Sequence, residues 1–521
     1  MQVPNKWYAN TIWLSVLVTL YLFALNFFSN QDIVKIYQSV LPALVFLLLL
    51  LIIGFLHRFV WKAIAIPSLF IASITLFFKW RYQATVTEDI LLSGMINDAS
   101  LTTEMLSLPL LIWLLLTAVI PTWIILRIAI GKTTWKKKVF ALLAVLLLIG
   151  MTMRIQGYEY RARGQIRDYK TVQAIGSFSP LDILYAYKKA RKAHQVLTKK
   201  YLQAKEVLHQ YKDEDRDQLI VLIVGESTRG DHLSLNGYNK ETTPKLQSIK
   251  NLYSFRHAKS CDTLTLRSMH YMFSPLTCRE EEGSVNEAAF TEVFHSLGYH
   301  IEIYSLQTLN AFYHYLGYDT LVSKYAVVRE QKQGTKDISL LPYIQKSIEG
   351  YTKGKKLIVI HTLGSHQSYF DRIEKYQERF KPTCNSADVA LCAREELVNS
   401  YDNTIVAIDG FVASIIGMLS QKRAMLVYLS DHGESLGEGG VYFHGKPKKS
   451  APKEQFKIPF LFWFSNSYSR TAEVKQFTNW VDTFSLDANV SHDHLFHSIL
   501  GCAGISSEDG GIDTRLNFCQ E

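Results

Sequence analysis

The sequence predicts a chain of two unlike domains: a bundle of five membrane-spanning helices, followed by an α/β domain built on a parallel sheet. Long apolar runs with few charges fill residues 1–153, and the mean hydropathy of +0.03 over the whole chain conceals this division. From residue 217 to residue 521, strand-like runs alternate with segments of helical periodicity. Three of the strand-like runs are followed at once by carboxylate or imidazole side chains, which indicates a functional site.

Five apolar runs in the first domain have the length and composition of membrane spans. About 20 apolar residues cross a bilayer as a helix, and the third and fifth runs need polar flanking residues to complete the crossing. A cleaved signal peptide does not fit the first run, because that run is long and four more follow it. The expected spans are Asn10–Phe28, Leu41–Val60, Ala63–Phe78, Leu108–Ile130 and Val139–Met153.

The charges of the short connections predict the orientation of these spans. The connection His57–Lys62 is basic, as is the one between the fourth and fifth spans, so we expect both on the cytoplasmic side with the N-terminus. The connection Glu88–Ser107, between the third and fourth spans, is acidic and is expected outside. Five crossings from a cytoplasmic start then place residues 154–521 outside the cytoplasm.

Residues 154–216 are expected to connect the two domains. Pro180–Lys212 has helical spacing and many lysines, which suits either a helix resting on anionic head groups or a solvated charged helix. The formal net charge of +9 fits an acidic lipid surface but identifies no partner. Nothing in the sequence indicates nucleic-acid binding, and we expect a monomer.

The cysteines agree with an oxidising compartment. All six lie in the predicted outer domain, and an even number there predicts three disulfides. The pair Cys384 and Cys392 would close a short loop. Zinc ligation by cysteine is the competing interpretation, but no CxxC pair supports it. The remaining four are Cys261, Cys278, Cys502 and Cys519.

Three apolar runs of the outer domain predict buried parallel strands, namely Leu219–Val224, Leu357–Ile360 and Ala424–Leu429. Arg394–Ser420 has apolar residues at helical spacing and predicts a helix packed on the sheet. Strands that alternate with helices in this way are typical of an α/β layer fold.

Each of these strands leads directly into side chains that could bind a metal. Glu226 follows the first strand, and His361 and His366 follow the second. Asp431 and His432 follow the third, with His444 a little further on. Ligands bind outside the carboxyl ends of strands in open α/β sheets, so the three ends are expected to converge. Imidazole and carboxylate are ligands that suit Zn²⁺.

Longer motifs carry a resemblance to a known family. VGESTRGDHLSLNGYNKETTP, SCDTLTLRSMHYMFS and DHGESLGEGGVYFHGKPKKSAPKEQ resemble motifs of the inner-membrane phosphoethanolamine transferases of Gram-negative bacteria. Members of that family modify lipid A or the lipopolysaccharide core, and some confer polymyxin resistance. The resemblance covers nearly the whole chain. It implies a multi-pass protein of the bacterial inner membrane, with a periplasmic catalytic domain of the alkaline phosphatase or sulfatase fold.

The resemblance also implies roles for particular residues. The zinc ligands of the family fall on Glu226, Thr265, Asp431 and His432, and its nucleophile falls on Thr265. Composition alone does not choose this threonine over the other hydroxyls nearby. The histidines that contact the substrate phosphate or a second metal ion match His366 and His444, and Glu434 matches a further acidic residue near the site. One zinc ion is therefore expected, or two.

The implied donor is phosphatidylethanolamine, and the implied acceptor is lipid A or the lipopolysaccharide core. In the family, residues of the loop between the third and fourth spans help to bind the ethanolamine head, which points to Asn97, Thr103 and Glu104. A carboxylate that faces an ammonium group is reasonable physically. The cluster His492, His494 and His497 also suggests a metal, but it reads more simply as part of an amphipathic helix.

The chain departs from the family pattern near Thr265. Asp262 stands where the family usually has glycine, and Met269-His270-Tyr271 replaces a Val-Pro-Cys run. The usual local disulfide cannot form, so we expect Cys261 to pair with Cys278. His366 is followed by Gln367-Ser368 in place of the common Gly-Pro. These changes leave the predicted zinc ligands intact and bear on the identity of the acceptor.

Other functions fit the same motifs. A phosphodiester hydrolase of the sulfatase fold and a glycerophosphotransferase would use the same metal ligands. A membrane sensor with a decayed site is a third interpretation. It is disfavoured because the four predicted zinc ligands are all present.

Overall fold

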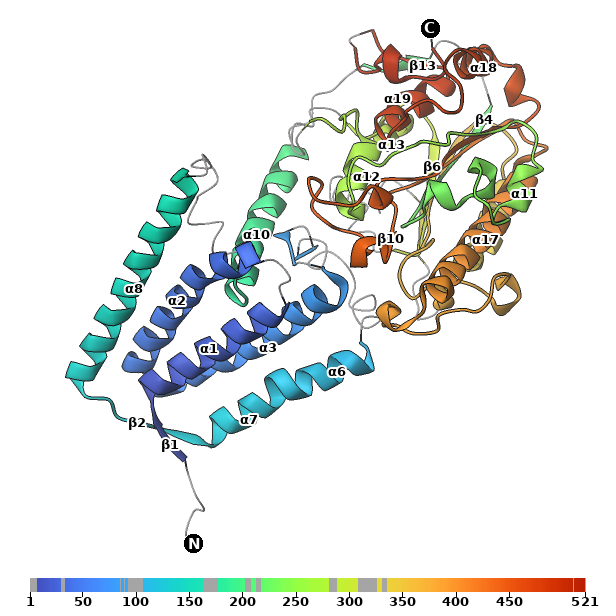
Figure 1. Ribbon diagram of the computed structural model, residues 1–521. Helices are drawn as coiled ribbons and strands as arrows, with labels where there is room; N and C mark the ends of the chain where they lie inside the picture. Colours follow the sequence, from blue (N-terminus) through green and yellow to red (C-terminus); the bar gives the residue numbers. More distant parts are fainter. Residues whose placement is uncertain are drawn as a thin grey trace. The chain divides into compact units, whose positions relative to one another are not determined.

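The computed structural model describes residues 7–29, 33–84, 86–88, 90–91, 106–162, 177–201, 208–211, 217–280, 288–307, 326–329, 335–508 and 510–520. They form two compact units, one within Met1–Leu92 and Leu106–Lys192 and the other within Ala193–Glu521 (Figure 1). The first unit is helical and the second is α/β. The domain boundaries at residues 153 and 216 stay a prediction; helix α8 runs through residue 153, and residues 212–216 are not described.

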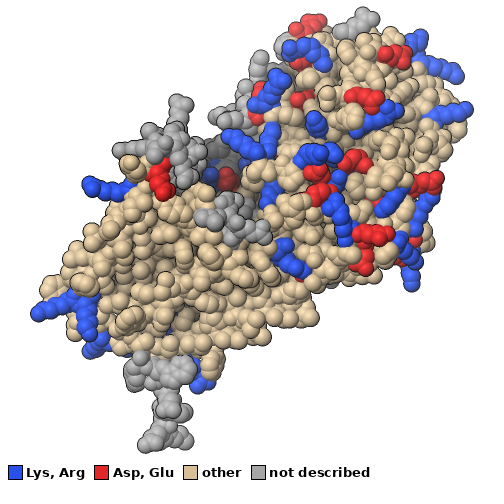
Figure 2. Space-filling model, viewed as in Figure 1, with Lys and Arg blue, Asp and Glu red and all other residues tan. Residues whose placement is uncertain are grey.

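Five apolar helical segments of the first unit coincide with the predicted spans, and each is long enough to cross a membrane. Large apolar side chains on their outer faces, such as Leu116 (57% exposed) and Leu147 (65%), suit contact with lipid tails. Figure 2 shows few charges on the visible face of these spans. The segments are α1 (Thr11–Ser29), α2 (Ile33–Leu56), α3 (Arg58–Tyr82), α6 (Leu108–Leu114) continued by a π-helical turn (Leu115–Val119) and α7 (Ile120–Arg127), and α8 (Trp135–Ala162).

The connection between the second and third spans is shorter than predicted. Only His57 separates α2 from α3. The prediction of a loop around Arg58 and Lys62 is therefore wrong, because both cations lie in the first turns of α3. Long basic side chains tolerate this position because their stems can lie along apolar surface while the charge reaches water. Strand β1 (Trp7–Asn10) pairs in parallel with β2 (Ile128–Gly131), which follows the fourth span. The N-terminal segment therefore lies at the same end of the bundle as the second basic connection, as the orientation requires.

The predicted connecting helix is confirmed only in its first part. α10 covers Leu181–Tyr201. Gln210–Tyr211 instead form strand β3, which pairs antiparallel with β13 (Ile505–Ser506) near the end of the chain. The prediction of a helix that continues to residue 212 is thus wrong, because the backbone groups of Gln210 and Tyr211 form hydrogen bonds to another strand.

A seven-stranded sheet forms the centre of the second unit. Its order is β5-β12-β9-β4-β8-β6-β7, and the block from β9 to β7 is parallel while β12 runs antiparallel to β9. The three predicted strands are thereby confirmed as the adjacent strands β9, β4 and β8. The bounds are β4 Gln218–Gly225, β5 Leu252–Ser254, β6 His300–Ser305, β7 Ala326–Arg329, β8 Lys355–His361, β9 Ala424–Ser430 and β12 Phe460–Phe464.

Helices cover both faces of this sheet (Figure 1). The predicted helix is confirmed as α17 (Arg394–Leu419), a sixth long apolar helix that is largely buried within this unit. It packs with α16 (Leu341–Glu349) and α11 (Pro244–Gln247). The other face shares one hydrophobic core with α12 (Thr265–Phe273), α13 (Phe290–Ser296), α18 (Ala472–Phe484) and α19 (Asp493–Cys502). Because every residue of β4 is buried between these layers, only the strand ends can present polar groups to a ligand.

All six cysteines form disulfides, as the sequence predicts. The expected pairs Cys261–Cys278 and Cys384–Cys392 are both present, and Cys502–Cys519 is the third. The first of these encloses α12, the helix that begins at Thr265.

Candidate active site

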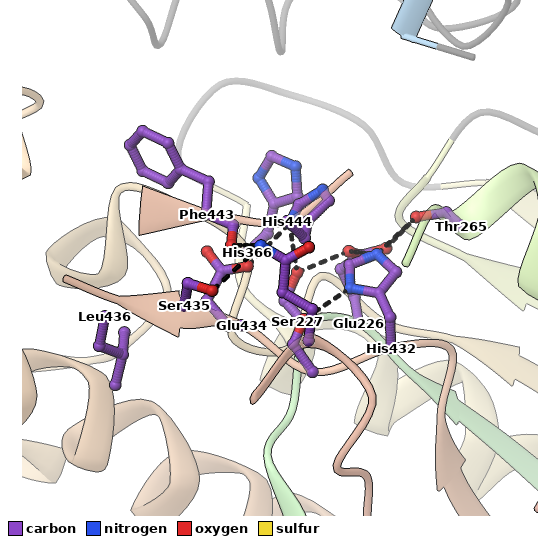
Figure 3. Close-up of polar contacts among 12 residues, drawn as sticks. Glu226, Ser227, Thr265, His366, His432, Glu434, Ser435, Leu436, Phe443 and His444 are labelled. Atoms are coloured by element: carbon purple, nitrogen blue, oxygen red, sulfur yellow. Dashed lines mark hydrogen bonds and ion pairs between the residues drawn. The ribbon is translucent and has the colours of Figure 1, made fainter. Parts of the chain in front are cut away.

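Four side chains meet where β4 and β9 end. Glu226 follows β4, Asp431 and His432 follow β9, and Val224 and Gly225 lie in register with Leu429 and Ser430 on the two strands. Thr265 Oγ1 lies 3.0 Å from Glu226 Oε2 and 3.3 Å from His432 Nε2 (Figure 3). The structure therefore brings together the four residues expected to hold zinc.

Thr265 is the first residue of α12, which has nine residues. The first N–H groups of a helix lack partners inside it, and the helix dipole favours negative charge at this end. A negative charge that develops on Thr265 Oγ1 is thus stabilised by the local backbone. The Cys261–Cys278 disulfide restrains this segment from both sides.

The donor atoms around Thr265 fit a cation. His432 Nδ1 lies 2.9 Å from the carbonyl of Gly433 and donates to it, so Nε2 carries the free electron pair of the neutral ring. That nitrogen faces Glu226 Oε1 at 3.3 Å and Asp431 Oδ2 at 3.1 Å. Asp431 Oδ2 is buried and receives no hydrogen bond from any residue that the structure describes. Electron pairs that converge in this way repel one another unless a positive charge lies between them.

The pKa values of these groups also favour a positive charge between them. Burial, together with the Glu226 carboxylate, raises the pKa of Asp431 to about 8. Burial opposes charge on His432, but Asp431 and Glu226 raise the pKa of that imidazole to about 10. Burial also disfavours ionised Glu226, yet the imidazole of His432 holds the pKa of Glu226 well below its usual range. A proton on His432 is thus strongly held, in the position where a metal ion would supply the charge.

A second cluster lies beside the first and contains the other predicted histidines. His444 Nδ1 lies 2.8 Å from Glu434 Oε2, and the His444 ring is 4.1 Å from that of His432 and 5.9 Å from that of His366. Glu226, His366 and His444 have ligand atoms within 4.8 Å of one another, as have His432, Glu434 and His444. Burial lowers the pKa of His366 to about 3, so this imidazole is neutral and can serve as a ligand.

Ser227 connects the two clusters. Its hydroxyl donates to Glu226 Oε1 at 2.8 Å and lies 3.3 Å from His444 Nδ1. The residue has φ of +56°, an uncommon conformation for a residue with a side chain, and Tyr401 donates a hydrogen bond to its carbonyl. Gly225 lies two residues before Ser227, and a side chain there would clash, because a Cβ would lie 2.7 Å from the hydroxyl of Tyr428. The abrupt end of the apolar run at this glycine thus has a steric cause.

Polar residues next to the predicted ligands order the surrounding loops. Arg229 pairs with Asp231 at 2.9 Å and with Glu438 at 2.7 Å, which ties the loop after β4 to the loop after β9. His232 pairs with Asp402 at 2.7 Å. These contacts give Asp231 and His232 structural roles.

The His492 cluster also has a structural role. His492 Nε2 lies 2.9 Å from the carbonyl of Ser430, and its Nδ1 accepts a hydrogen bond from the backbone N–H of Cys261 at 3.3 Å. Both nitrogens are therefore engaged by the backbone. His492 joins the segment that leads to Thr265 to the end of β9, and α19 follows it.

Two residues that the sequence analysis missed contact the site. Gln307, after β6, donates to Glu226 Oε2 at 2.8 Å, and Tyr369 donates to Glu434 Oε1 at 2.9 Å. Neither has a spacing signal; the only clue to Gln307 was its place directly after a strand-like run. The predicted substrate residues Asn97, Thr103 and Glu104 lie outside the described residues.

Two families match the chain. The sulfatase family matches residues 218–505, and the family described as phosphoethanolamine transferase EptA/EptB matches residues 44–190. Kdo(2)-lipid A phosphoethanolamine 7''-transferase of Escherichia coli (strain K12) is 29% identical over 95% of this chain and 92% of that protein. Phosphoethanolamine transferase EptA of Salmonella typhimurium is 31% identical over 75% of this chain and 72% of its own length.

Solved structures share the fold. Lipooligosaccharide phosphoethanolamine transferase A from Neisseria meningitidis, an integral membrane protein, matches with a TM-score of 0.80 at 21% identity, over 98% of this chain and 99% of that one. The C-terminal periplasmic domain of EcEptC from Escherichia coli, solved in complex with Zn, matches with a TM-score of 0.50 at 23% identity, over 61% and 90% of the two chains. The predicted sulfatase-like fold behind a membrane domain is confirmed.

Proposed function

The chain belongs to the phosphoethanolamine transferase family, and we propose that it moves phosphoethanolamine from phosphatidylethanolamine to lipid A or the lipopolysaccharide core. It is a protein of the bacterial inner membrane, with apolar helices as its anchor and a periplasmic catalytic domain. Three disulfides in that domain agree with an oxidising compartment. The observation that carries the proposal is the position of Thr265 Oγ1, beside Glu226 and His432 at a helix N-terminus.

We propose Zn²⁺ as the cofactor, held by Glu226, Asp431 and His432 together with Thr265. Two observations support this set: among the described residues none donates a hydrogen bond to the buried Asp431 Oδ2, and the electron pair of His432 Nε2 faces the site. When bound, Zn²⁺ is a Lewis acid that lowers the pKa of an alcohol and offsets charge on phosphoryl oxygens. For a second ion, the ligand atoms of Glu226, His366 and His444 lie close enough together, as do those of His432, Glu434 and His444, and each set shares one residue with the first site.

In the proposed first step, Thr265 Oγ1 attacks the phosphorus of phosphatidylethanolamine, and the bond to the diacylglycerol oxygen breaks. The hydroxyl proton of Thr265 leaves on the side of Glu226 Oε2, its hydrogen-bond acceptor. A histidine then protonates the leaving oxygen. His444 suits this role better than His366, because His444 Nδ1 lies 2.8 Å from Glu434 Oε2, whereas burial lowers the pKa of His366 to about 3.

The second step reverses the first with a different alcohol or phosphate. The phosphoethanolamine ester on Thr265 is attacked by an acceptor oxygen, and Thr265 regains its proton as the ester bond breaks. The neutral form of His444 that remains after the first step can accept the acceptor's proton. Two half-reactions on one residue predict ping-pong kinetics.

Replacing Thr265 tests the proposal. In cells that express Thr265→Ala, mass spectrometry of lipopolysaccharide should show no added phosphoethanolamine, because no other hydroxyl takes the place of Thr265 Oγ1. Stability should fall by only about 1 kcal/mol, the value of one hydrogen bond. In the wild type, the fragment that gains the mass of one phosphoethanolamine identifies the acceptor, lipid A or core.

Ser268→Ala is the matched control. Ser268 lies on the same helix, and its hydroxyl donates to the carbonyl of Asp262 at 3.2 Å. This variant should lose a similar hydrogen bond and keep transfer. Normal lipopolysaccharide modification by Thr265→Ala would remove this residue from the mechanism. Head groups released to water at the same rate with and without acceptor would favour the hydrolase.

A further inference from the structure

The carboxylate of Glu226 is held by side chains from two directions. Gln307 Nε2 donates to its Oε2 at 2.8 Å, and Ser227 Oγ donates to its Oε1 at 2.8 Å. We propose that Gln307 is a positioning residue: it fixes the orientation of the Glu226 carboxylate toward zinc and toward Thr265. The inference rests on the proposed zinc-dependent transfer and adds a fourth strand, β6, to those that build the site.

Gln307 is itself held firmly. It is 7% exposed, and a turn at the end of β6 fixes its backbone, with Ser305 Oγ accepting from Gln307 N and donating to Gln307 O. Leu306 N donates to the carbonyl of His361, which ties this turn to the neighbouring strand β8. The position of the amide is therefore set by the sheet.

The orientation of the amide follows from its partners. Gln307 Nε2 donates one hydrogen to Glu226 Oε2 at 2.8 Å and the other to the carbonyl of Thr362 at 2.9 Å. A flipped amide would place its oxygen against a carboxylate and a carbonyl, so only this orientation is favourable. Both donors of the amide nitrogen are used, and neither remains for a substrate.

The remaining electron pairs of Glu226 then face the site. Each carboxylate oxygen can accept about two hydrogen bonds or ligands. Gln307 occupies one position on Oε2, whose other neighbour is Thr265 Oγ1 at 3.0 Å. Ser227 occupies one position on Oε1, whose other neighbour is His432 Nε2 at 3.3 Å. Without Gln307, the carboxylate could rotate about its last bond and turn Oε2 away from both zinc and the nucleophile.

Outer partners of metal ligands typically affect metal affinity by about 10- to 100-fold. We expect Gln307→Leu, which keeps most of the volume and removes the donor, to weaken Zn²⁺ binding by that factor. We also expect kcat to fall while KM for phosphatidylethanolamine stays within about twofold, because Gln307 Nε2 has no donor left for substrate. Gln307→Asn is one methylene too short to reach both acceptors and should give a smaller loss of the same kind.

Gln218→Leu is the matched control. Gln218 is also buried, at 3% exposed, and begins β4 at the opposite end from Glu226. Its amide donates to the carbonyl of Ala503 and accepts from Tyr299, so the variant loses comparable hydrogen bonds. It should lose stability and keep its affinity for Zn²⁺ within about twofold.

The measurement is competition of the purified full-length protein in detergent against a chromophoric chelator, with Zn²⁺ alone as the probe. A 10- to 100-fold loss of affinity in Gln307→Leu, with none in Gln218→Leu, supports the inference. Equal affinities for wild type and both Gln307 variants, or equal losses in Gln307→Leu and Gln218→Leu, overturn it while transfer by the wild type leaves the proposed function standing. A wild type that neither binds Zn²⁺ nor transfers phosphoethanolamine overturns both.

Discussion

Tyr369→Phe removes a single oxygen atom, yet it should clearly lower the free energy of unfolding. Tyr369 is 3% exposed, Glu434 is fully buried, and the hydroxyl donates to Glu434 Oε1 at 2.9 Å. The variant keeps the ring, which packs edge-on against Tyr401 with ring centroids 5.3 Å apart, so little packing is lost. A hydrogen bond to a charged group is worth roughly 1.5–3 kcal/mol, and the buried carboxylate oxygen would lose the donor that the tyrosine hydroxyl supplies. We therefore expect a loss of about 2 kcal/mol in the free energy of unfolding.

Tyr468→Phe provides the comparison. Tyr468 is as buried, and its hydroxyl donates to the neutral carbonyl of Cys502 at 2.9 Å. Loss of a neutral hydrogen bond should cost about 1 kcal/mol. Chemical denaturation of the full-length protein in detergent, followed by near-ultraviolet circular dichroism, measures both. If Tyr369→Phe lowers the free energy of unfolding no more than Tyr468→Phe does, Tyr369 does not stabilise a buried Glu434 carboxylate.

The variants Tyr369→Phe and Tyr468→Phe also distinguish an effect on stability from an effect on catalysis. Glu434 accepts from Tyr369 on one oxygen and lies 2.8 Å from His444 Nδ1 on the other. Loss of the Tyr369 hydrogen bond should leave the Glu434 carboxylate, and with it His444, less firmly positioned. We expect kcat to fall by about 10-fold, in the range found for outer partners of metal-ligating histidines. Tyr468→Phe should leave kcat unchanged. An unchanged kcat in both variants would show that Tyr369 serves stability alone.

Two further predictions concern zinc and pH. Zn²⁺ at 100 times its Kd should raise the free energy of unfolding by about 2.7 kcal/mol, and a chelator or Asp431→Asn should remove this gain. Thermal unfolding with and without Zn²⁺ measures the gain. Equal midpoints in the two conditions would contradict the proposed zinc site. Burial lowers the pKa of His492 to about 3, so the unfolded chain gains a proton as pH falls below about 6.5 while the folded chain does not. Stability should therefore be lost on acidification, by about 1.4 kcal/mol per pH unit from this group, and His492→Gln should flatten the profile by one proton. An identical slope in that variant would show that another group is responsible.

The residues that we propose as metal ligands could be predicted in part, because they follow strands that the sequence makes recognisable. Glu226, Asp431 and His432 come directly after continuous apolar runs, and such runs form buried parallel strands whose ends meet. Thr265 follows no such run, and only the resemblance to a family selected it. Its place beside Glu226 depends on the Cys261–Cys278 disulfide that encloses α12 and on His492, which lies far from Thr265 in the sequence.

Errors in the prediction have a similar origin. The loop expected around Arg58 and Lys62 is absent because a charged residue does not end a helix when its long side chain can reach water. The helix expected up to Lys212 ends earlier because Gln210 and Tyr211 pair with a strand near the C-terminus. Local periodicity contains no information about such a distant partner.

The sequence by itself determined the two-domain plan, the spans, the central strands and the residues proposed as ligands at two of their ends. These depend on composition and on short-range periodicity, which the burial of apolar surface imposes directly on the chain. Only the tertiary structure decided that β6 lies beside β8, that Gln307 reaches Glu226, and that Tyr369 reaches Glu434. Hydrogen bonds between buried polar side chains depend on distances of a few tenths of an ångström across separate elements, and no pattern along the chain encodes them.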